Sequence, residues 1–288
     1  MVKPTLIDGF FNKSPDLDTT KSVIAVGDSW FSMGSIPPWN TSNLLLNLQF
    51  TNSTTVVYYG VPGQDVQDMS NPKRNPLFVG NLTLRGATAW DAILVSGGGD
   101  DVIDFAAMSA TLPDGTVRPQ SQRLFLTSGE WNPNDTTPNR YISPAGSAAL
   151  FNNLQTYYAN IVALRDSSAN PDAPIFTHTY DYSTPRNAGV PIVAPHGWIY
   201  PILLNYFIPS KDWDDVAKIL INQIRQALDR IAQGSHNFNV VNTIGTLIPA
   251  ADGAVGPSND WYNEIHPTDA GYAKLGGVWN TALASAGL

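Results

Sequence analysis

A serine and a histidine near opposite ends of the chain are the residue types that nucleophilic catalysis needs. Ser29 follows Gly27-Asp28, and His266 precedes Pro267. A serine hydroxyl becomes a nucleophile when a nearby histidine takes its proton, and N–H donors must then stabilise the oxyanion. These residue types therefore suit nucleophilic catalysis. The alternative is that Asp28-Ser29 only caps a helix, a common place for both residue types.

The segment before Ser29 has the character of a buried strand. Residues 22–26 form a short apolar run that Gly27 ends, which is typical of a parallel strand covered on both faces. Similar runs predict four more strands at 54–59, 92–96, 174–178 and 237–242. Helical spacing predicts helices at 44–48, about 100–108, 150–161, 212–234 and after Thr268. This alternation favours an α/β fold with one parallel sheet between helices, in a single domain over residues 1–288.

The carboxyl ends of parallel strands share one edge of a sheet, where open α/β sheets bind their ligands. Three glycine-containing turns follow the first three predicted strands, and they contain Ser29, Gly63 and Gly98-Gly99-Asp100-Asp101. We therefore expect these turns to converge, with His266 on a loop near the same edge.

Three segments lack clear periodicity. Residues 1–20 are expected to form an irregular arm. Residues 109–145 and 180–209 are expected to be irregular insertions near the site, because long loops in compact domains are usually functional or mobile. We also expect 109–145 to influence substrate size.

Composition limits the classes of partner. The 288-residue chain has no cysteine, which excludes a disulfide framework and a thiolate metal site. Its net charge of −8 and lack of a basic run argue against nucleic acid. We expect neither a cofactor nor a metal, and the oligomeric state stays open. No signal peptide or bilayer-spanning stretch is visible, so a cytoplasmic protein is expected, with secretion after removal of a leader as the alternative.

Taken together, the motifs resemble the SGNH (GDSL-type) hydrolases over about residues 22–285. The residues that carry the resemblance are Gly27-Asp28-Ser29, Gly63, Gly98-Gly99-Asp100-Asp101 and His266-Pro267-Thr268. Residues 176–182 and 263–267 look similar to a bacterial serine esterase branch of that family. The resemblance implies a three-layer α/β/α sandwich with a flavodoxin-like, five-stranded parallel sheet.

The resemblance also implies roles. Ser29 would be the nucleophile and its N–H an oxyanion donor, Gly63 would supply a second N–H, and His266 would be the general base. The implied activity is hydrolysis of small to medium acyl esters of small molecules, carbohydrates or lipids. Two alternatives stay open: an acyltransferase on the same scaffold, or a catalytically weakened binding protein.

One departure from the family pattern concerns the oxyanion hole. Asp100 stands where the family usually has an asparagine whose amide is a donor. An ionised carboxylate would oppose the developing negative charge, whereas a protonated one could donate. An alternative register places Gly99 there, with no side-chain donor.

The other departure concerns the third member of a catalytic triad. Asn263 stands where the family commonly has an aspartate. An amide can orient the histidine ring but stabilises the imidazolium less. Asp260 and Glu264 are nearby candidates, and a Ser–His dyad assisted by a carbonyl oxygen is a further possibility. We expect structural roles for His178, for Asp28 as a brace of the Ser29 turn, and for Asp101 as a helix cap.

Overall fold

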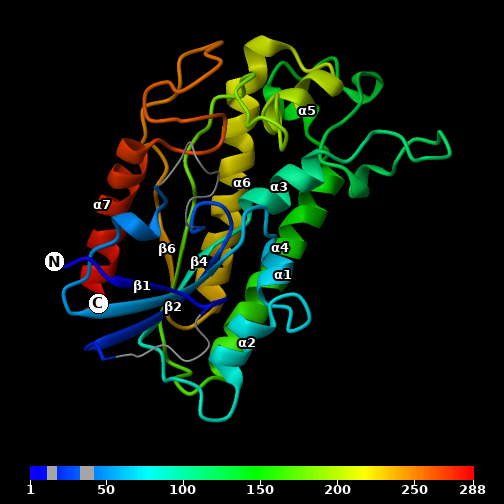
Figure 1. Ribbon diagram of the computed structural model, residues 1–288. Helices are drawn as coiled ribbons and strands as arrows, with labels where there is room; N and C mark the ends of the chain where they lie inside the picture. The colour runs from blue at the N-terminus through cyan, green and yellow to red at the C-terminus, as the bar shows by residue number, and fades with distance from the viewer. Residues whose placement is uncertain (12–17, 33–41) are drawn as a thin grey trace.

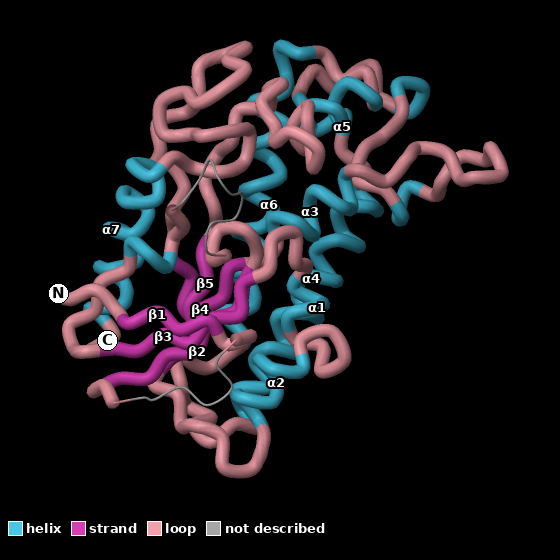
Figure 2. The backbone as a smooth tube through the Cα atoms, in the orientation of Figure 1, coloured by secondary structure: helices cyan, strands magenta, loops and turns pink. Residues whose placement is uncertain are grey.

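The computed structural model describes residues 1–11, 18–32 and 42–288, and its centre is a parallel sheet of six strands (Figures 1 and 2). The strands are β1 (Thr5–Asp8), β2 (Lys21–Gly27), β3 (Thr54–Gly60), β4 (Ala92–Ser96), β5 (Ile175–His178) and β6 (Phe238–Val241). Their order across the sheet is β1-β3-β2-β4-β5-β6, and every neighbouring pair is parallel.

Five of the six strands match the predicted ones, and without β1 their order is that of a flavodoxin-like sheet. The sixth strand corrects the prediction of an irregular arm: Thr5 to Asp8 pair with Thr55 to Tyr58 of β3. A half-buried edge strand of four residues is too short to show a period in the sequence. The rest of the arm, at residues 12–17, lies outside the described residues.

Helices cover both faces of the sheet, which gives the expected three-layer α/β/α sandwich. They are α1 (Val66–Met69), α2 (Pro76–Thr83), α3 (Gly99–Ala106), α4 (Pro144–Asp166), α5 (Ile199–Asn205), α6 (Trp213–Gly234) and α7 (Asp269–Ser285). Helix α7 packs with the 3-10 turn Leu45–Asn47 on one side of the sheet, and α1, α2, α4 and α6 lie on the other (Figure 1). None of the described helices is both long enough and apolar enough to cross a membrane.

The core is centred on β2 and β4. Residues 23–26 and 92–95 of these strands are fully buried, because helices cover both faces of the central strands. The turn that follows β2 therefore lies near the middle of the sheet's carboxyl edge. That is the position at which Ser29 was expected.

Two irregular segments differ in what they contact. Residues 109–145 contain three 3-10 turns, at Gln120–Gln122, Ser128–Glu130 and Pro138–Tyr141. The first packs against α4 and the third against α6. The fully buried guanidinium of Arg123 holds this segment together by donating to Glu130 at 2.6 Å. The second segment, 180–209, contains α5 and runs over the carboxyl edge of the sheet. The predicted helix at 44–48 is only the 3-10 turn Leu45–Asn47.

Candidate active site

The turn that carries Ser29 is fixed by close packing between β2 and β4. An added Cβ at Gly27 would lie 2.9 Å from Cβ of Ser96, so this position has no room for a side chain. The N–H of Asp28 donates to the backbone oxygen of Ser96 at 3.0 Å. The buried Asp28 Oδ1 accepts from the N–H of Trp30 at 2.9 Å and from the hydroxyl of Ser96 at 2.7 Å. Asp28 thus braces the turn, as predicted.

Ser29 and His266 meet although 237 residues separate them. His266 Nε2 lies 2.8 Å from Ser29 Oγ, and His266 Nδ1 lies 3.1 Å from Asn263 Oδ1. That amide oxygen also accepts from the backbone N–H groups of His266 and Ile265. Because donors fix the amide with its oxygen toward the ring, Nδ1 carries the proton and Nε2 accepts from the serine hydroxyl. Burial lowers the pKa of His266 to about 4, which leaves the ring neutral near neutral pH.

The two acidic alternatives for the third member have other partners. Asp260 Oδ2 accepts from Lys274 Nζ at 2.6 Å and from the N–H of Ile248 at 2.6 Å. Glu264 accepts backbone N–H groups, among them those of residues 186, 199 and 200. In the part of the chain that the structure describes, neither carboxylate contacts His266. The residue that holds the ring is therefore Asn263.

The loop that carries His266 is itself braced from two sides. The buried Arg186 donates to the backbone oxygens of Asn263 at 2.7 Å and Ala254 at 2.9 Å. From the other side, Nε1 of Trp30 donates to the backbone oxygen of Ile265 at 3.2 Å. The second contact joins the histidine loop directly to the serine turn, so the two reacting groups are positioned together.

Asp100 lies in the first turn of α3 and lines the same cavity as Ser29. Burial raises its pKa well above the usual value, and the negative charges of Asp28, Asp65 and Asp101 raise it further. The protonated form, which can donate a hydrogen bond, is therefore favoured at pH values where an exposed aspartate is ionised.

The other predicted groups near this edge are placed differently. Gly63 lies in an exposed turn after β3 with φ of +75° and is not among the residues that line the cavity. The prediction that Asp101 caps its own helix is wrong. Gly98 is the N-cap of α3, and Asp101 Oδ2 instead accepts from the N–H of Val66, the first residue of α1, at 3.0 Å.

The cavity beside Ser29 has a volume of about 60 Å³ and is apolar away from the reacting groups. Its apolar lining comes from α3, α5, α6 and the loop before His266: Val102, Ile103, Ala217, Leu220, Ile221, Ile224, Ile199, Trp261 and Ile265. Segment 180–209 contributes Tyr180, Asp181, Ser183 and Ile199, whereas no described residue of 109–145 lines the cavity. Only the second predicted insertion therefore borders the site.

Several of these residues had no chemical role in the sequence interpretation. The stripe of α6 was recognised as the buried face of a helix, but nothing in its spacing distinguishes a cavity wall from ordinary core. Among the residues that the structure describes, no group of three or more His, Asp or Glu side chains could hold a metal ion.

Comparison with known proteins decides the family. The sequence model of the GDSL-like Lipase/Acylhydrolase family matches residues 25–274. The chain belongs to this family. The resemblance seen in the motifs is thereby confirmed. No curated protein matches the sequence significantly.

The chain is also similar to several solved structures. An extracellular lipase from Streptomyces rimosus aligns with a TM-score of 0.52 and 13% identity, over 93% of this chain and 100% of that one. The lipase Lip_vut3 from a goat rumen metagenome aligns with a TM-score of 0.49 and 12% identity, over 91% and 97%. A carbohydrate acetylesterase from Sinorhizobium meliloti aligns with a TM-score of 0.45 and 13% identity, over 93% and 100%. Only the first of these alignments supports the fold, and at 13% identity it concerns the fold alone.

Proposed function

We propose that this protein is a serine ester hydrolase that cleaves small to medium acyl esters through an acyl-enzyme on Ser29. The observation that carries the proposal is the 2.8 Å contact between Ser29 Oγ and the buried, neutral His266 Nε2 at the wall of an apolar cavity. A hydroxyl paired with a neutral base whose second nitrogen is held by an acceptor is the arrangement that activates a serine.

In the first half of the reaction, Ser29 Oγ attacks the ester carbonyl carbon while His266 Nε2 takes the hydroxyl proton. Among the described residues, the N–H of Ser29 donates to no other group, so it is available to the oxyanion, whereas Gly63 lies in an exposed turn outside the cavity. Protonated Asp100 adds a second donor. The bond to the alcohol oxygen then breaks, and His266 returns its proton to that oxygen, which leaves an acyl group on Ser29.

In the second half, a water molecule attacks the acyl carbon and His266 takes one of its protons. The bond to Ser29 Oγ breaks, the serine regains its proton, and the carboxylic acid leaves. Throughout both halves Asn263 Oδ1 accepts from His266 Nδ1 and keeps the ring aligned.

The acyl and alcohol parts of the ester would occupy two cavities of different volume. The cavity of about 60 Å³ holds a few water molecules or a short acyl chain. A larger groove of about 670 Å³ is lined by Thr184 and Tyr200, which are the chain neighbours of cavity residues Ser183 and Ile199. We assign the acyl group to the cavity and the alcohol to the groove.

The groove favours a hydroxylated alcohol over a long alkyl chain. It is lined by the aromatic rings of Tyr200 and Trp213 and by Lys211, Asp214 and Asp252. Among the described residues, none of these three charged side chains has an ion-pair partner. Unpaired charged groups beside aromatic rings suit the hydroxyl groups and C–H faces of a carbohydrate, so acylated sugars are the first substrates to test.

The test is turnover of aryl and sugar esters of graded acyl length by the protein, two site variants and one control variant. Ser29→Ala and His266→Ala should each lower kcat by about 10⁴-fold or more, because the two residues act as a unit. Ser183→Ala is the matched control, since Ser183 lines the cavity without contacting His266, and it should stay within a few-fold of the parent. Near-parental turnover by a folded Ser29→Ala protein would contradict the proposal. Acyl transfer to added alcohols in preference to water would favour the acyltransferase instead.

A further inference from the structure

Tyr180, two residues after β5, has no role in the reaction steps above. Its hydroxyl donates a short hydrogen bond to Asp28 Oδ2, and both groups are buried. The other oxygen of Asp28 accepts from Trp30 and Ser96, as described for the serine turn. Among the described residues, Tyr180 is thus the only donor to Oδ2. One of the three hydrogen bonds that hold this carboxylate in place therefore comes from the phenol group of Tyr180.

The backbone of Tyr180 is held in an uncommon conformation. Its φ is +59°, in the left-handed region that aromatic residues rarely occupy. The backbone oxygen of Tyr180 accepts from Thr243 Oγ1 at 2.7 Å, just after β6. Its N–H donates to His178 Nδ1 at 3.4 Å. Because such strain persists only where the surroundings fix it, the direction of this side chain is determined by several elements at once.

His178 provides a second route from Tyr180 to the serine turn. Burial lowers the pKa of His178 to about 3, so its ring is neutral. With Nδ1 accepting from Tyr180, the proton lies on Nε2, which donates to Ser96 Oγ at 2.9 Å. Ser96 then donates to Asp28. The structural role predicted for His178 is therefore part of the same network.

The ring of Tyr180 also contacts the turn that carries Asp100. An added Cβ at Gly99 would lie 3.1 Å from Cζ of Tyr180, so the ring packs directly against the first residue of α3. On its other side it meets the ring of Trp30 edge-on at 5.0 Å between centroids. Tyr180 lines the cavity between these two contacts. One side chain thus touches both the turn of the nucleophile and the turn of the side-chain oxyanion donor.

We propose that Tyr180 is a positioning residue that holds the Ser29 turn and the Asp100 turn in register, so that both groups reach the same ester carbonyl. This inference rests on the proposed function. Tyr180 acts through Asp28 and Gly99 and takes no proton from the substrate.

The charge state of Asp28 reports on this contact. Burial raises the pKa of Asp28 to about 6, while the hydrogen bond from Tyr180 lowers it. Only the ionised carboxylate accepts all three hydrogen bonds, so kcat should fall on the acid side as Asp28 is protonated. The other titratable groups that interact with Asp28 come from α3, α4 and α7: Asp100, Asp101, Tyr158 and Tyr272. His178 of β5 is linked to Asp28 through Ser96.

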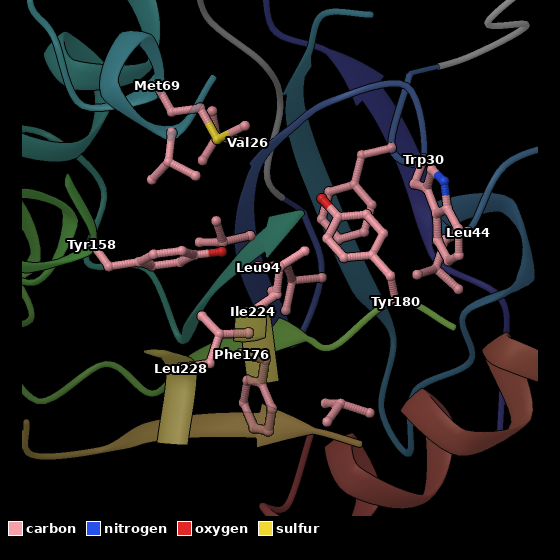
Figure 3. Close-up of a cluster of buried hydrophobic side chains, with 14 of the residues drawn as sticks. Val26, Trp30, Leu44, Met69, Leu94, Tyr158, Phe176, Tyr180, Ile224 and Leu228 are labelled. Atoms are coloured by element: carbon pink, nitrogen blue, oxygen red, sulfur yellow. The ribbon is translucent and has the colours of Figure 1, made fainter. Parts of the chain in front are cut away.

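The experiment compares Tyr180→Phe with Tyr158→Phe. Tyr158 is the matched control because it is fully buried in the same cluster (Figure 3) and its hydroxyl donates to the backbone oxygen of Gly97 rather than to Asp28. On one aryl ester, Tyr180→Phe should lower kcat about tenfold with KM nearly unchanged, the size of one lost hydrogen bond to a charged group. Its acid-side limb should move to higher pH. Tyr158→Phe should keep the parental pH profile even if its melting temperature falls.

The same kcat and pH profile in both variants would overturn the inference. Asp28→Asn gives an independent check, and it decides the question if Tyr180→Phe does not fold. Asp28→Asn should also lower kcat, and adding Tyr180→Phe to it should cost little more, because both changes remove one contact. Fully additive losses would contradict this. If the parent protein neither turns over esters nor reacts at Ser29 with a fluorophosphonate, the proposed function fails together with the inference. If the parent protein is active but Tyr180→Phe and Tyr158→Phe have the same kcat and pH profile, the role of Tyr180 is contradicted while the proposed function stands.

Discussion

At the scale of single residues, the site differs from a full catalytic triad in the group behind the histidine. Asn263 gives His266 Nδ1 an oxygen acceptor and fixes the tautomer, but it places no negative charge beside the imidazolium that forms during the reaction. The amide nitrogen of Asn263 is buried and has no hydrogen-bond partner among the described residues. Replacing this nitrogen by the second oxygen of an aspartate would therefore break no existing hydrogen bond.

Asn263→Asp should raise kcat by about tenfold or more, because a carboxylate stabilises the imidazolium that the amide cannot. It should also raise the pKa of His266 from about 4. The measurements are kcat across pH and an NMR titration of the His266 ring. A raised pKa without faster turnover would show that imidazolium formation does not limit the reaction.

Asp100→Asn tests the oxyanion hole. The amide donates at every pH, whereas the carboxyl donates only while it is protonated, and its pKa is raised by burial and neighbouring carboxylates. Below that pKa the two proteins should have similar turnover. Above it the parent should lose a factor of about 100 to 1,000 relative to the variant, as when one side-chain donor is removed. Parallel pH profiles on one aryl ester would mean that Asp100 does not face the oxyanion.

The motifs predicted that Ser29 and His266 meet, because strand ends and a histidine loop lie on one edge of the sheet. For the group behind the histidine they left Asn263, Asp260 and Glu264 open, and the structure places Asn263 there. Tyr180 could not be found in this way. Its contact with Asp28 spans 152 positions and depends on a backbone conformation that the residue type disfavours. The network of Tyr180, His178 and Ser96 is thus a property of the folded chain rather than of a motif.

At the scale of elements, the strongly apolar strands and the long helices could be predicted from hydrophobic periodicity and from the glycine and proline residues that end them. The predicted helix at 212–234 corresponds to α6, and Thr268 caps α7 by accepting from the N–H of Gly271, as expected. The short edge strand β1 was missed. The position of segment 109–145 could not be predicted from the sequence either, because a segment without periodicity does not indicate which element it packs against.

Helix α6 forms one wall of the cavity, which makes chain-length preference a property of that helix. Ile224→Ala enlarges the cavity and should shift preference toward longer acyl esters. Ile231→Ala is the control, because it lies on the buried stripe of α6 away from the cavity. Each change should cost about 2–5 kcal/mol of stability, but only the first should alter the ratio of kcat/KM between long and short esters. Equal ratios in both variants would place the acyl group elsewhere.

At the scale of the whole molecule, buried titratable groups should make stability depend on pH in an unusual direction. Burial raises the pKa of Asp28 to about 6 and the pKa values of Asp101 and Glu264 to about 7. These carboxyls bind protons more readily in the folded chain, so they add stability as pH falls through those values. Burial lowers the pKa values of His178 and His266 to about 3 and 4, so these rings cost stability as pH falls below about 6.5.

The three carboxyls outweigh the two histidines between about pH 8 and pH 5.5, because their protonation in the folded chain begins at higher pH. The melting temperature should therefore be a few degrees higher at about pH 5.5 than at about pH 8. Thermal unfolding followed by circular dichroism measures this. Asp101→Asn should flatten the dependence. If the melting temperature instead rises steadily toward pH 8, ionisation of these carboxyls in the folded protein does not lower its free energy of unfolding.

Covalent labelling by a fluorophosphonate, followed by mass spectrometry of the digested peptides, tests most directly whether Ser29 is the nucleophile. A serine activated by His266 should react stoichiometrically, and the adduct should lie on the peptide that contains Ser29. Denatured protein and His266→Ala should label far more slowly. An unlabelled native protein, or an adduct on any other serine, would contradict the assignment of Ser29 as the nucleophile.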